Sequence, residues 1–124
     1  MRPDLQFELQ VLTLENRERK PLFTGAYTIY DPSWDFKSDA ATFVASRSAD
    51  PNIYDIYWSD LFGNLRQVTD IRGFLSEPAF SRDGQMILFV KDRSGAPNKG
   101  LGKICSVPVI GGAVTIIDDT KRIN

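Results

Sequence analysis

The chain has 124 residues, of which 42% are hydrophobic and 25% are charged, ordinary proportions for a folded globular domain. Its 15 basic residues nearly cancel its 16 acidic ones, and neither sign forms a long block, so a broad electrostatic surface for nucleic acid is not expected. The chain has no histidine and one cysteine, which excludes Ser-His-Asp and Cys-His catalytic arrangements and an internal disulfide.

The chain carries no recognisable membrane or export signal. No apolar stretch approaches the roughly 18 residues of a membrane span, and residues 1–10 lack the hydrophobic core of a signal peptide. As written, the chain is expected to be neither exported nor inserted in a membrane. If the chain is cut from a longer precursor, this expectation does not hold.

The first expected element is a strand near the N-terminus. Apolar residues alternate there with Gln6, Glu8 and Gln10, and they are Leu5, Phe7, Leu9 and Val11. Alternation with a period of two predicts a strand that buries one face. The charged run at 17–20 predicts a solvated turn after it.

Residues 32–52 and 78–98 are one segment written twice at an offset of 46, with seven identities in 21 positions. The identical pairs include Pro32 and Pro78, Phe43 and Phe89, and Arg47 and Arg93. The match continues at an offset of 48, and its downstream half recurs faintly at residues 20–22. The chain is therefore half a repeat followed by two whole ones.

Each whole repeat predicts four antiparallel strands. A short strand follows the proline, a turn leads to an apolar run (41–45 or 86–90) expected to be buried on both faces, and a third strand covers 53–59 or 103–109. Gly63 or Gly111 then turns the chain into a fourth strand. A strand-rich period of about 40 to 50 residues is typical of a β-propeller blade. We therefore expect an all-β fold of about 2.5 blades: a half blade of outer strands at 1–30, a full blade at 31–76, and a second full blade with a C-terminal extension at 77–124.

Several strings of the second repeat resemble a known family. They are the segments 78–84 (PAFSRDG), 87–90 (ILFV), 92–95 (DRSG) and 97–98 (PN), which look like the WD40-like repeat of TolB-type propellers. The related propeller of the prolyl oligopeptidase family shares much of this pattern. Arg82 stands where the motif has proline, and the first copy has 36–39 (FKSD) in place of the tight Asp-Gly turn. The resemblance covers about 90 residues and implies a propeller fold.

The recurring residues have structural interpretations. Asp83 and Gly84 suit a two-residue hairpin, because both tolerate positive φ. Pro32 and Pro78 are expected at the entry of a first strand, where a missing N–H is harmless.

The recurring aromatic residues are expected to fill the wedge between adjacent blades, because their side chains are large. They are Trp34 and Phe43 in the first repeat and Phe80 and Phe89 in the second. Arg47 and Arg93 end the second strand of each repeat, where hydrogen bonds to a neighbouring loop are expected.

No catalytic, cofactor or metal site is predicted. Asp118 and Asp119 resemble half of a metal site, but without histidine a zinc site is not expected. Calcium held by oxygen ligands in a central channel stays open. The glycine-rich stretch 95–103 lacks the Gly-Lys-Ser/Thr of a phosphate-binding loop and precedes a strand instead of a helix.

Loops on one face form the candidate binding surface. In a four-stranded blade, the loop between the second and third strands and the link to the next blade emerge together. Mixed aromatic, arginine and acidic residues on such loops are typical of protein interfaces. The residues expected on this face are Tyr27, Tyr30, Asp31, Arg47, Asn52, Arg72, Phe74, Glu77, Arg93, Asn98 and Lys99.

A partial ring constrains the function, because propellers close with about four to eight blades. The chain is a fragment of a longer protein, a partial ring completed by self-association, or an engineered piece. The favoured hypothesis is a non-catalytic scaffold that binds a protein partner; in TolB-type proteins that role belongs to cell-envelope assemblies. The alternatives are a fragment of the propeller that gates a prolyl-oligopeptidase-like serine hydrolase, and an oligomeric propeller that binds a glycan or small ligand.

Overall fold

The computed structural model describes residues 7–26, 28–47, 53–91 and 102–119, and every regular element in these ranges is a β-strand. No helix that could cross a membrane occurs in these ranges. The strands are β1 (Phe7–Thr13), β2 (Glu18–Ala26), β3 (Thr28–Asp35), β4 (Ala40–Ser46), β5 (Asp55–Asp60), β6 (Leu65–Gln67), β7 (Leu75–Phe80), β8 (Met86–Lys91), β9 (Lys103–Pro108) and β10 (Thr115–Asp119).

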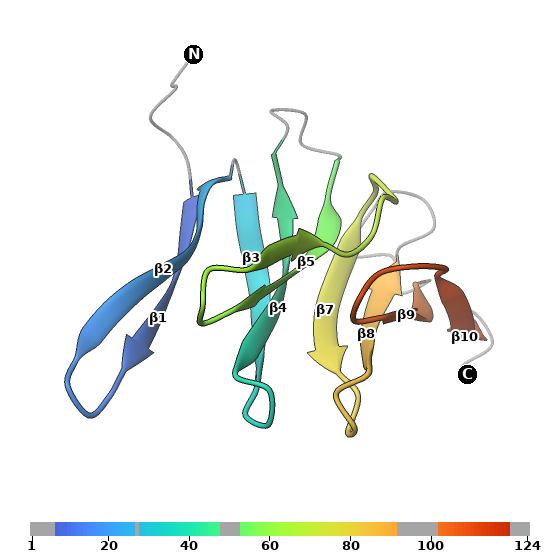
Figure 1. Ribbon diagram of the computed structural model, residues 1–124. Helices are drawn as coiled ribbons and strands as arrows, with labels where there is room; N and C mark the ends of the chain where they lie inside the picture. The colour runs from blue at the N-terminus through green and yellow to red at the C-terminus, as the bar shows by residue number, and fades with distance from the viewer. Residues whose placement is uncertain (1–6, 27, 48–52, 92–101, 120–124) are drawn as a thin grey trace, which may run out of the picture.

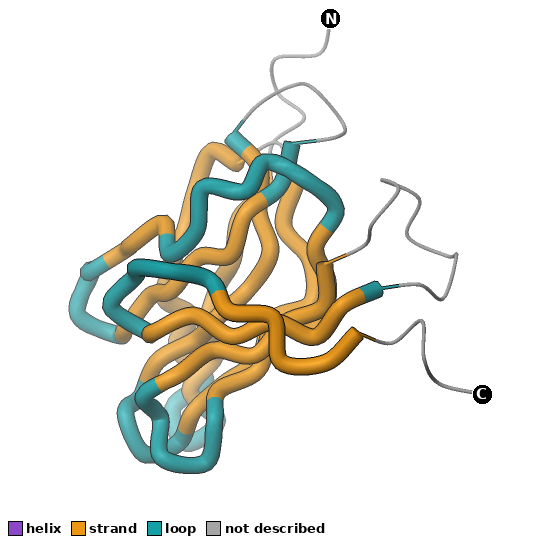
Figure 2. Tube along the Cα trace, turned by 90° about the vertical axis from the view of Figure 1, so that its right-hand side faces the viewer, coloured by secondary structure: helices purple, strands orange, loops and turns teal. Residues whose placement is uncertain are grey.

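The strands form three antiparallel sheets that stand side by side (Figure 1). Strands β3 to β6 make a first four-stranded blade, β7 to β10 make a second, and β1 and β2 pair with each other. Loops and turns gather at the two ends of the strands (Figure 2). The all-β fold of a partial propeller is confirmed. Residues 28–30, which the repeat boundaries placed with the half blade, lie in β3.

Pro32 and Pro78 lie inside β3 and β7, so the expectation that they stand at a strand entry is wrong. The pairing register shifts between Tyr30 and Ser33, and again between Ser76 and Ala79. Each proline therefore sits in a β-bulge, where the strand has a residue without a ladder partner and a missing N–H costs little.

The residue before each bulge proline adopts a left-handed conformation. Asp31 and Glu77 both have a φ of 55°. Asp31 also accepts a hydrogen bond from the backbone N–H of Glu77 at 3.0 Å, one repeat period away along the chain. The bulge therefore recurs in both blades, and in the first blade its acidic side chain also holds the second blade.

The turn at Asp83 and Gly84 is longer than the predicted two-residue hairpin. The N–H of Ser81 donates to the carbonyl of Met86 at 2.8 Å, which leaves a four-residue loop at 82–85. Only Gly84 of the pair has a positive φ, 74°, whereas a two-residue turn of the Asp-Gly kind needs it at both positions. Asp83 instead accepts hydrogen bonds from the Ser81 hydroxyl and the Gln85 N–H.

Two clusters of buried side chains join the three sheets. We call the cluster between the β1–β2 pair and the first blade the hairpin contact; it consists of Phe23, Ala26, Ala41, Phe43, Ala45 and Tyr57. The cluster between the two blades, the blade contact, consists of Val44, Ile56, Val68, Leu75, Ile87, Phe89, Cys105 and Val107. Trp34 packs partly buried against the hairpin contact, and Phe80 packs in the same way against the blade contact.

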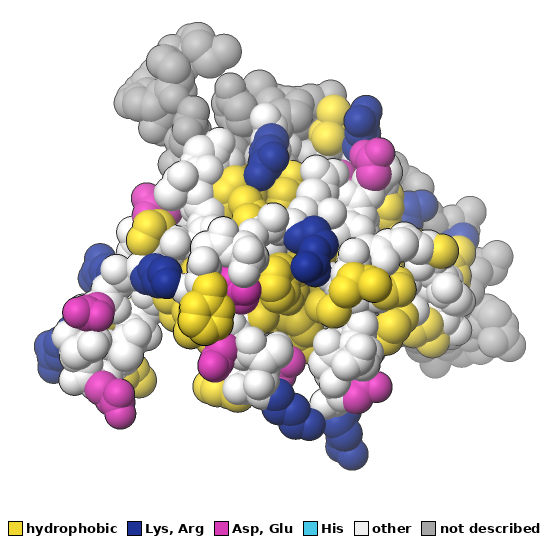
Figure 3. All heavy atoms as spheres, in the orientation of Figure 1, with side chains coloured by type: hydrophobic (Ala, Val, Ile, Leu, Met, Phe, Trp, Pro, Cys, Tyr) yellow, Lys and Arg dark blue, Asp and Glu magenta, His cyan; other side chains and the backbone are white. Residues whose placement is uncertain are grey.

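The two apolar runs differ in burial. All seven residues of β4 are buried, whereas β8 alternates between buried and half-buried side chains. The expectation that β8 is buried on both faces is therefore wrong, because no sheet in the described part of the chain covers its second face. Figure 3 shows hydrophobic side chains gathered across the middle of one face of the molecule.

Hydrogen bonds between residues about one repeat apart also tie the two blades together. The Tyr30 hydroxyl donates to the Leu75 carbonyl at 2.6 Å, and the Lys37 ammonium donates to the Arg82 carbonyl at 3.1 Å. The Arg66 guanidinium donates to the Val109 carbonyl at 2.8 Å. These bonds fix the angle between the two blades at several positions along the strands. The loops at the ends of the blades are therefore attached to a rigid scaffold.

Candidate functional site

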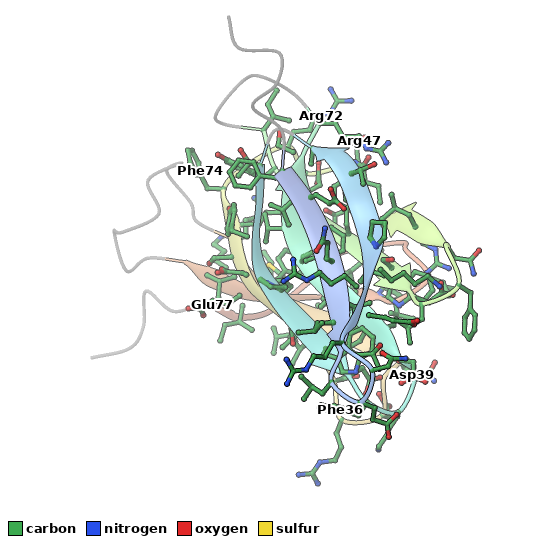
Figure 4. The ribbon with its side chains drawn as sticks, turned by 90° about the vertical axis from the view of Figure 1, so that its left-hand side faces the viewer. Phe36, Asp39, Arg47, Arg72, Phe74 and Glu77 are labelled. Carbon is green, nitrogen blue, oxygen red and sulfur yellow. The ribbon has the colours of Figure 1, made fainter. Side chains whose placement is uncertain are left out.

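The β4 end and the link from β6 to β7 meet at one end of the strands, which we call the mouth. Figure 4 shows Arg47 and Arg72 together at this end, while Phe36 and Asp39 lie at the opposite end. A hollow of about 360 Å³ opens at the mouth. It is lined by Ala45, Ser46, Arg47, Ile53, Asp55, Tyr57, Gln67, Asp70 and Arg72.

Asp55 anchors the link that forms one wall of this hollow. Only 4% of the residue is exposed, and its Oδ1 accepts hydrogen bonds from the Thr69 hydroxyl and the Ile71 N–H, both at 2.6 Å. The Arg72 N–H donates to the same carboxylate at 3.3 Å. Thr69 in turn accepts the N–H of Ile56 at 3.0 Å. One buried carboxylate therefore sets the path of the backbone toward the second blade.

Burial raises the pKa of the Asp55 carboxyl above its ordinary value, because desolvation disfavours the charged form. The hydrogen bonds from Thr69, Ile71 and Arg72 act in the opposite direction, and the charge of Asp70 adds to the increase. The carboxyl is hydrogen-bonded to the backbone of the link from within the scaffold, so we assign it a structural role.

Arg47 lies over two aromatic rings. Its guanidinium carbon is 5.1 Å from the ring centre of Phe23 and 5.5 Å from that of Tyr57, within range of cation–π attraction. The sequence predicted a loop-holding role through hydrogen bonds, whereas the structure places the side chain on these rings. Burial raises the pKa of the Tyr57 hydroxyl, and the charge of Arg47 opposes that increase.

Arg72 stands on the opposite wall with a φ of 58°. Its Nε is 3.0 Å from Asp70 Oδ1, and both side chains are about seven-tenths exposed (69% and 71%). An ion pair this exposed adds little stability. Its guanidinium therefore stays accessible to a partner at the rim of the hollow.

An aromatic cluster borders the mouth on the side of β7. The ring centres of Tyr30 and Tyr54 are 5.4 Å apart in an edge-to-face arrangement, and those of Tyr54 and Phe74 are 6.0 Å apart. Together with Leu75 and Ser76 they line a second hollow of about 260 Å³. Because the Tyr30 hydroxyl is bonded to the Leu75 carbonyl, this apolar hollow has a fixed wall.

The structure divides the described members of the predicted surface set into three groups. Arg47 and Arg72 come together at the mouth, whereas Asp31 and Glu77 are exposed on β3 and β7, the strands at which each blade begins. Tyr30 and Phe74 lie with the aromatic cluster. The remaining members of the predicted set fall outside the described residues, and they are Tyr27, Asn52, Arg93, Asn98 and Lys99.

Two contributors to the mouth escaped the sequence analysis. They are Asp55 and Tyr54, neither of which the sequence analysis singles out. The available signal was a carboxylate directly before the run Ile56, Tyr57 and Trp58 at the start of a strand, since a buried charge needs partners nearby. Among the described residues no group of three or more His, Cys, Asp or Glu side chains is placed to hold a metal ion.

Comparison with known proteins identifies the fold. No family model matches the sequence. The structure is similar to the crystal structure of TolB from Acinetobacter baumannii, with a TM-score of 0.61 and 19% sequence identity over 92% of this chain. The chain spans 30% of the length of that protein. At this identity the likeness concerns the fold alone, and the chain has the fold of part of a TolB-like β-propeller.

Proposed function

We propose that this chain is a non-catalytic propeller segment that binds a protein partner through its mouth. The observation that carries the proposal is the pairing of two hollows, one rimmed by Arg47 and Arg72 and one lined by Tyr30, Tyr54 and Phe74. Arginine and tyrosine are among the residues that dominate binding energy in protein interfaces. The apolar hollow offers a place to bury an apolar side chain of a partner. The hollow with the two arginines offers charged contacts to the same partner.

The proposal is supported by intramolecular contacts that hold the mouth in one geometry. Asp55 holds the link and the Tyr30 hydroxyl bond holds the aromatic wall. Arg47 rests on two rings. A preformed surface loses less side-chain and loop entropy on binding than a mobile one, so more of the contact energy appears as affinity.

The alternative in which several copies complete a ring by sharing blades has less support. If β1 is the third strand of a blade and β2 the fourth, the described strands of another copy offer the same outer pair and two complete blades, with no spare inner pair among them. Within the described residues, the gating role and the glycan-binding role gain no specific observation of their own. The protein partner therefore remains the proposed ligand.

The test is site-specific crosslinking with the full chain in cells. A photo-crosslinking amino acid replaces Asp70 at the rim of the hollow or, as a matched control, Asp39 at the opposite end; both are exposed aspartates. We expect a discrete protein adduct at position 70 that is absent at position 39. With that protein purified, Phe74→Ala and Arg72→Ala should each weaken binding at least about tenfold. Equal adducts from both positions, or unchanged affinity in both variants, would refute the proposal.

A further inference from the structure

The two hollows at the mouth share one wall. Tyr54 forms an isolated antiparallel bridge with Gly73, and the Gly73 N–H donates to the Tyr54 carbonyl at 3.2 Å. On one side of this bridge, Asp55 and Arg72 line the hollow of about 360 Å³, which we call the charged hollow. On the other side, Tyr54 and Phe74 line the hollow of about 260 Å³, which we call the aromatic hollow. The bridge is therefore a backbone ridge between a charged site and an apolar one.

The ridge carries no side chain at Gly73, although the fold does not require glycine there. A Cβ added to Gly73 would meet only the Cγ2 of Ile71, at 3.6 Å, which is an ordinary contact. Gly73 is also not among the glycines with positive φ. A glycine without either constraint suits a place where another backbone approaches closely. The space over the ridge is thus open to the backbone of a partner.

The charged hollow presents guanidinium N–H groups that lack a protein acceptor. Among the described residues, no acceptor bonds to the guanidinium of Arg47, which lies over the rings of Phe23 and Tyr57. An arginine over aromatic rings keeps its N–H groups available for a carboxylate. In the same part of the chain, Arg72 bonds to Asp70 through Nε alone. Two arginines with available donors favour a carboxylate as ligand, because charge-assisted hydrogen bonds are about twice as strong as neutral ones.

Asp55, the buried carboxylate of the charged hollow, does not satisfy these donors. Its oxygens already accept hydrogen bonds from the Thr69 hydroxyl and from the N–H groups of Ile71 and Arg72. The last of these bonds also helps to hold the Arg72 backbone at its φ of 58°. Arg72 is therefore positioned from within the scaffold, and its charge is available to a ligand.

We propose that the mouth recognises a short extended segment of its protein partner in which an aspartate or glutamate stands next to a bulky apolar residue. This inference rests on the proposed function and specifies the chemistry of the partner. The carboxylate pairs with Arg47 and Arg72, the apolar side chain enters the aromatic hollow, and the backbone between them crosses the ridge at Gly73. Successive side chains of an extended chain point to opposite sides, which matches two hollows on opposite sides of one ridge. Figure 4 shows Phe74 and the two arginines at the same end of the strands.

The first test is a selection of peptides on the full chain. A phage-displayed library of random short peptides is panned against the natural chain, after depletion on the Arg47→Gln, Arg72→Gln double variant. We expect the enriched sequences to share an acidic residue directly beside a bulky apolar one. Enriched sequences without a carboxylate, or the absence of any shared pattern, would overturn the inference.

The affinity of a selected peptide then identifies the charged contacts. Arg47→Gln and Arg72→Gln should each weaken binding at least about tenfold, because each removes charge-assisted hydrogen bonds. Replacing the acidic residue of the peptide by its amide should have an effect of the same size. Arg82→Gln is the matched control, because Arg82 is exposed in the turn between β7 and β8, and it should leave the affinity unchanged. An equal loss in all three arginine variants would indicate unspecific charge attraction and would contradict the proposed site.

Gly73→Ala tests the ridge. The variant should unfold at the same temperature as the natural chain, because the added Cβ meets ordinary space. It should bind the selected peptide at least about tenfold more weakly, because a methyl group then stands where the peptide backbone lies. Unchanged affinity in Gly73→Ala overturns the inference.

Failure of this inference is distinguishable from failure of the proposed function. A protein that crosslinks at position 70 and not at position 39, but binds Gly73→Ala and Arg47→Gln as tightly as the natural chain, overturns the acidic and apolar segment and leaves the mouth as the binding surface. Equal crosslinking at both positions refutes the proposed function, and this inference with it.

Discussion

The first and second blades share a repeat but differ in what covers them. The first blade lies between the hairpin contact and the blade contact, and all of β4 is buried as a result. In the second blade, Phe89 is 1% exposed on the covered side, while Leu88 and Val90 are half-buried on the other. The same apolar strand is thus a core strand in one blade and a one-sided strand in the next. Burial in this fold depends on the neighbouring sheet as much as on the strand itself.

The largest expected effect comes from the buried phenylalanines. Phe43→Ala and Phe89→Ala should each lower the free energy of unfolding by about 3 to 5 kcal/mol, because each leaves a cavity in a packed contact. Urea unfolding followed by circular dichroism measures the change. Trp34→Ala and Phe80→Ala should cost less, because both side chains are only partly buried. Equal losses at all four positions would show that the buried rings do not dominate these contacts.

Asp55 is a buried carboxylate of the first blade, and its repeat equivalent in the second blade is Lys103. Asp55→Ala should lower the free energy of unfolding by about 2 to 3 kcal/mol, because the Thr69 hydroxyl and the Ile71 N–H lose a buried charged acceptor. Calorimetric unfolding at neutral pH measures the loss. Lys103→Ala, at the equivalent repeat position of the second blade, is the matched control and should have a small effect.

The pH dependence of Asp55 follows from its raised pKa, since the folded chain holds the carboxyl proton more tightly than the unfolded chain does. The stability of the natural chain relative to Asp55→Asn should therefore fall as pH rises from about 4, the ordinary aspartate value, to the raised pKa, and then level off. Chemical unfolding of both chains across this range tests the sign. A relative stability that increases with pH would mean that the hydrogen bonds outweigh burial.

Val44 and Val90 occupy the same position in the two repeats. They therefore compare β4, which is buried on both faces, with β8, which is buried on one. Val44→Ala should lower the free energy of unfolding by about 2 kcal/mol, because Val44 is fully buried in the blade contact. Val90→Ala should cost less than about 1 kcal/mol, because Val90 is half-buried on the uncovered side. Parallel urea titrations compare the two. Equal costs would mean that the second face of β8 is covered in solution.

The smallest effect is expected at the two bulges. Asp31 and Glu77 share a φ of 55°, so replacing either with alanine changes a residue in a left-handed conformation. Only Asp31 also accepts the hydrogen bond from the Glu77 N–H. Asp31→Ala should therefore cost about 1 kcal/mol more than Glu77→Ala, the worth of one such bond. Thermal unfolding of the two variants side by side measures the difference.

The repeat predicted the blades because its signals are spaced along the chain. Prolines and aromatic side chains recur at 46 residues, and they mark β-bulges and inter-sheet packing in both blades. The prediction misplaced Pro32 and Pro78 because a proline is acceptable both at a strand entry and in a bulge. Only the ladder register distinguishes these two positions.

The candidate site was harder to predict than the fold. Arg47 and Arg72 were expected on one face because loops at one end of a blade converge, and both line the same hollow. Asp55 was missed because its partners, Thr69 and Ile71, are more than a dozen residues away and its repeat equivalent is Lys103. A hydrogen-bond network that occurs in one blade and not in the other gives no periodic signal.

The blade contact carries its own chemical reporter. Cys105 is the single cysteine of the chain, is fully buried in that contact, and has a thiol pKa that burial raises. Because the thiol is buried and burial disfavours its reactive thiolate, we expect a thiol reagent to reach it through openings that separate β9 from the first blade. The labelling rate of Cys105 can be followed by the mass of the intact protein without any added probe. This rate therefore reports how often the two blades separate in the unmodified protein.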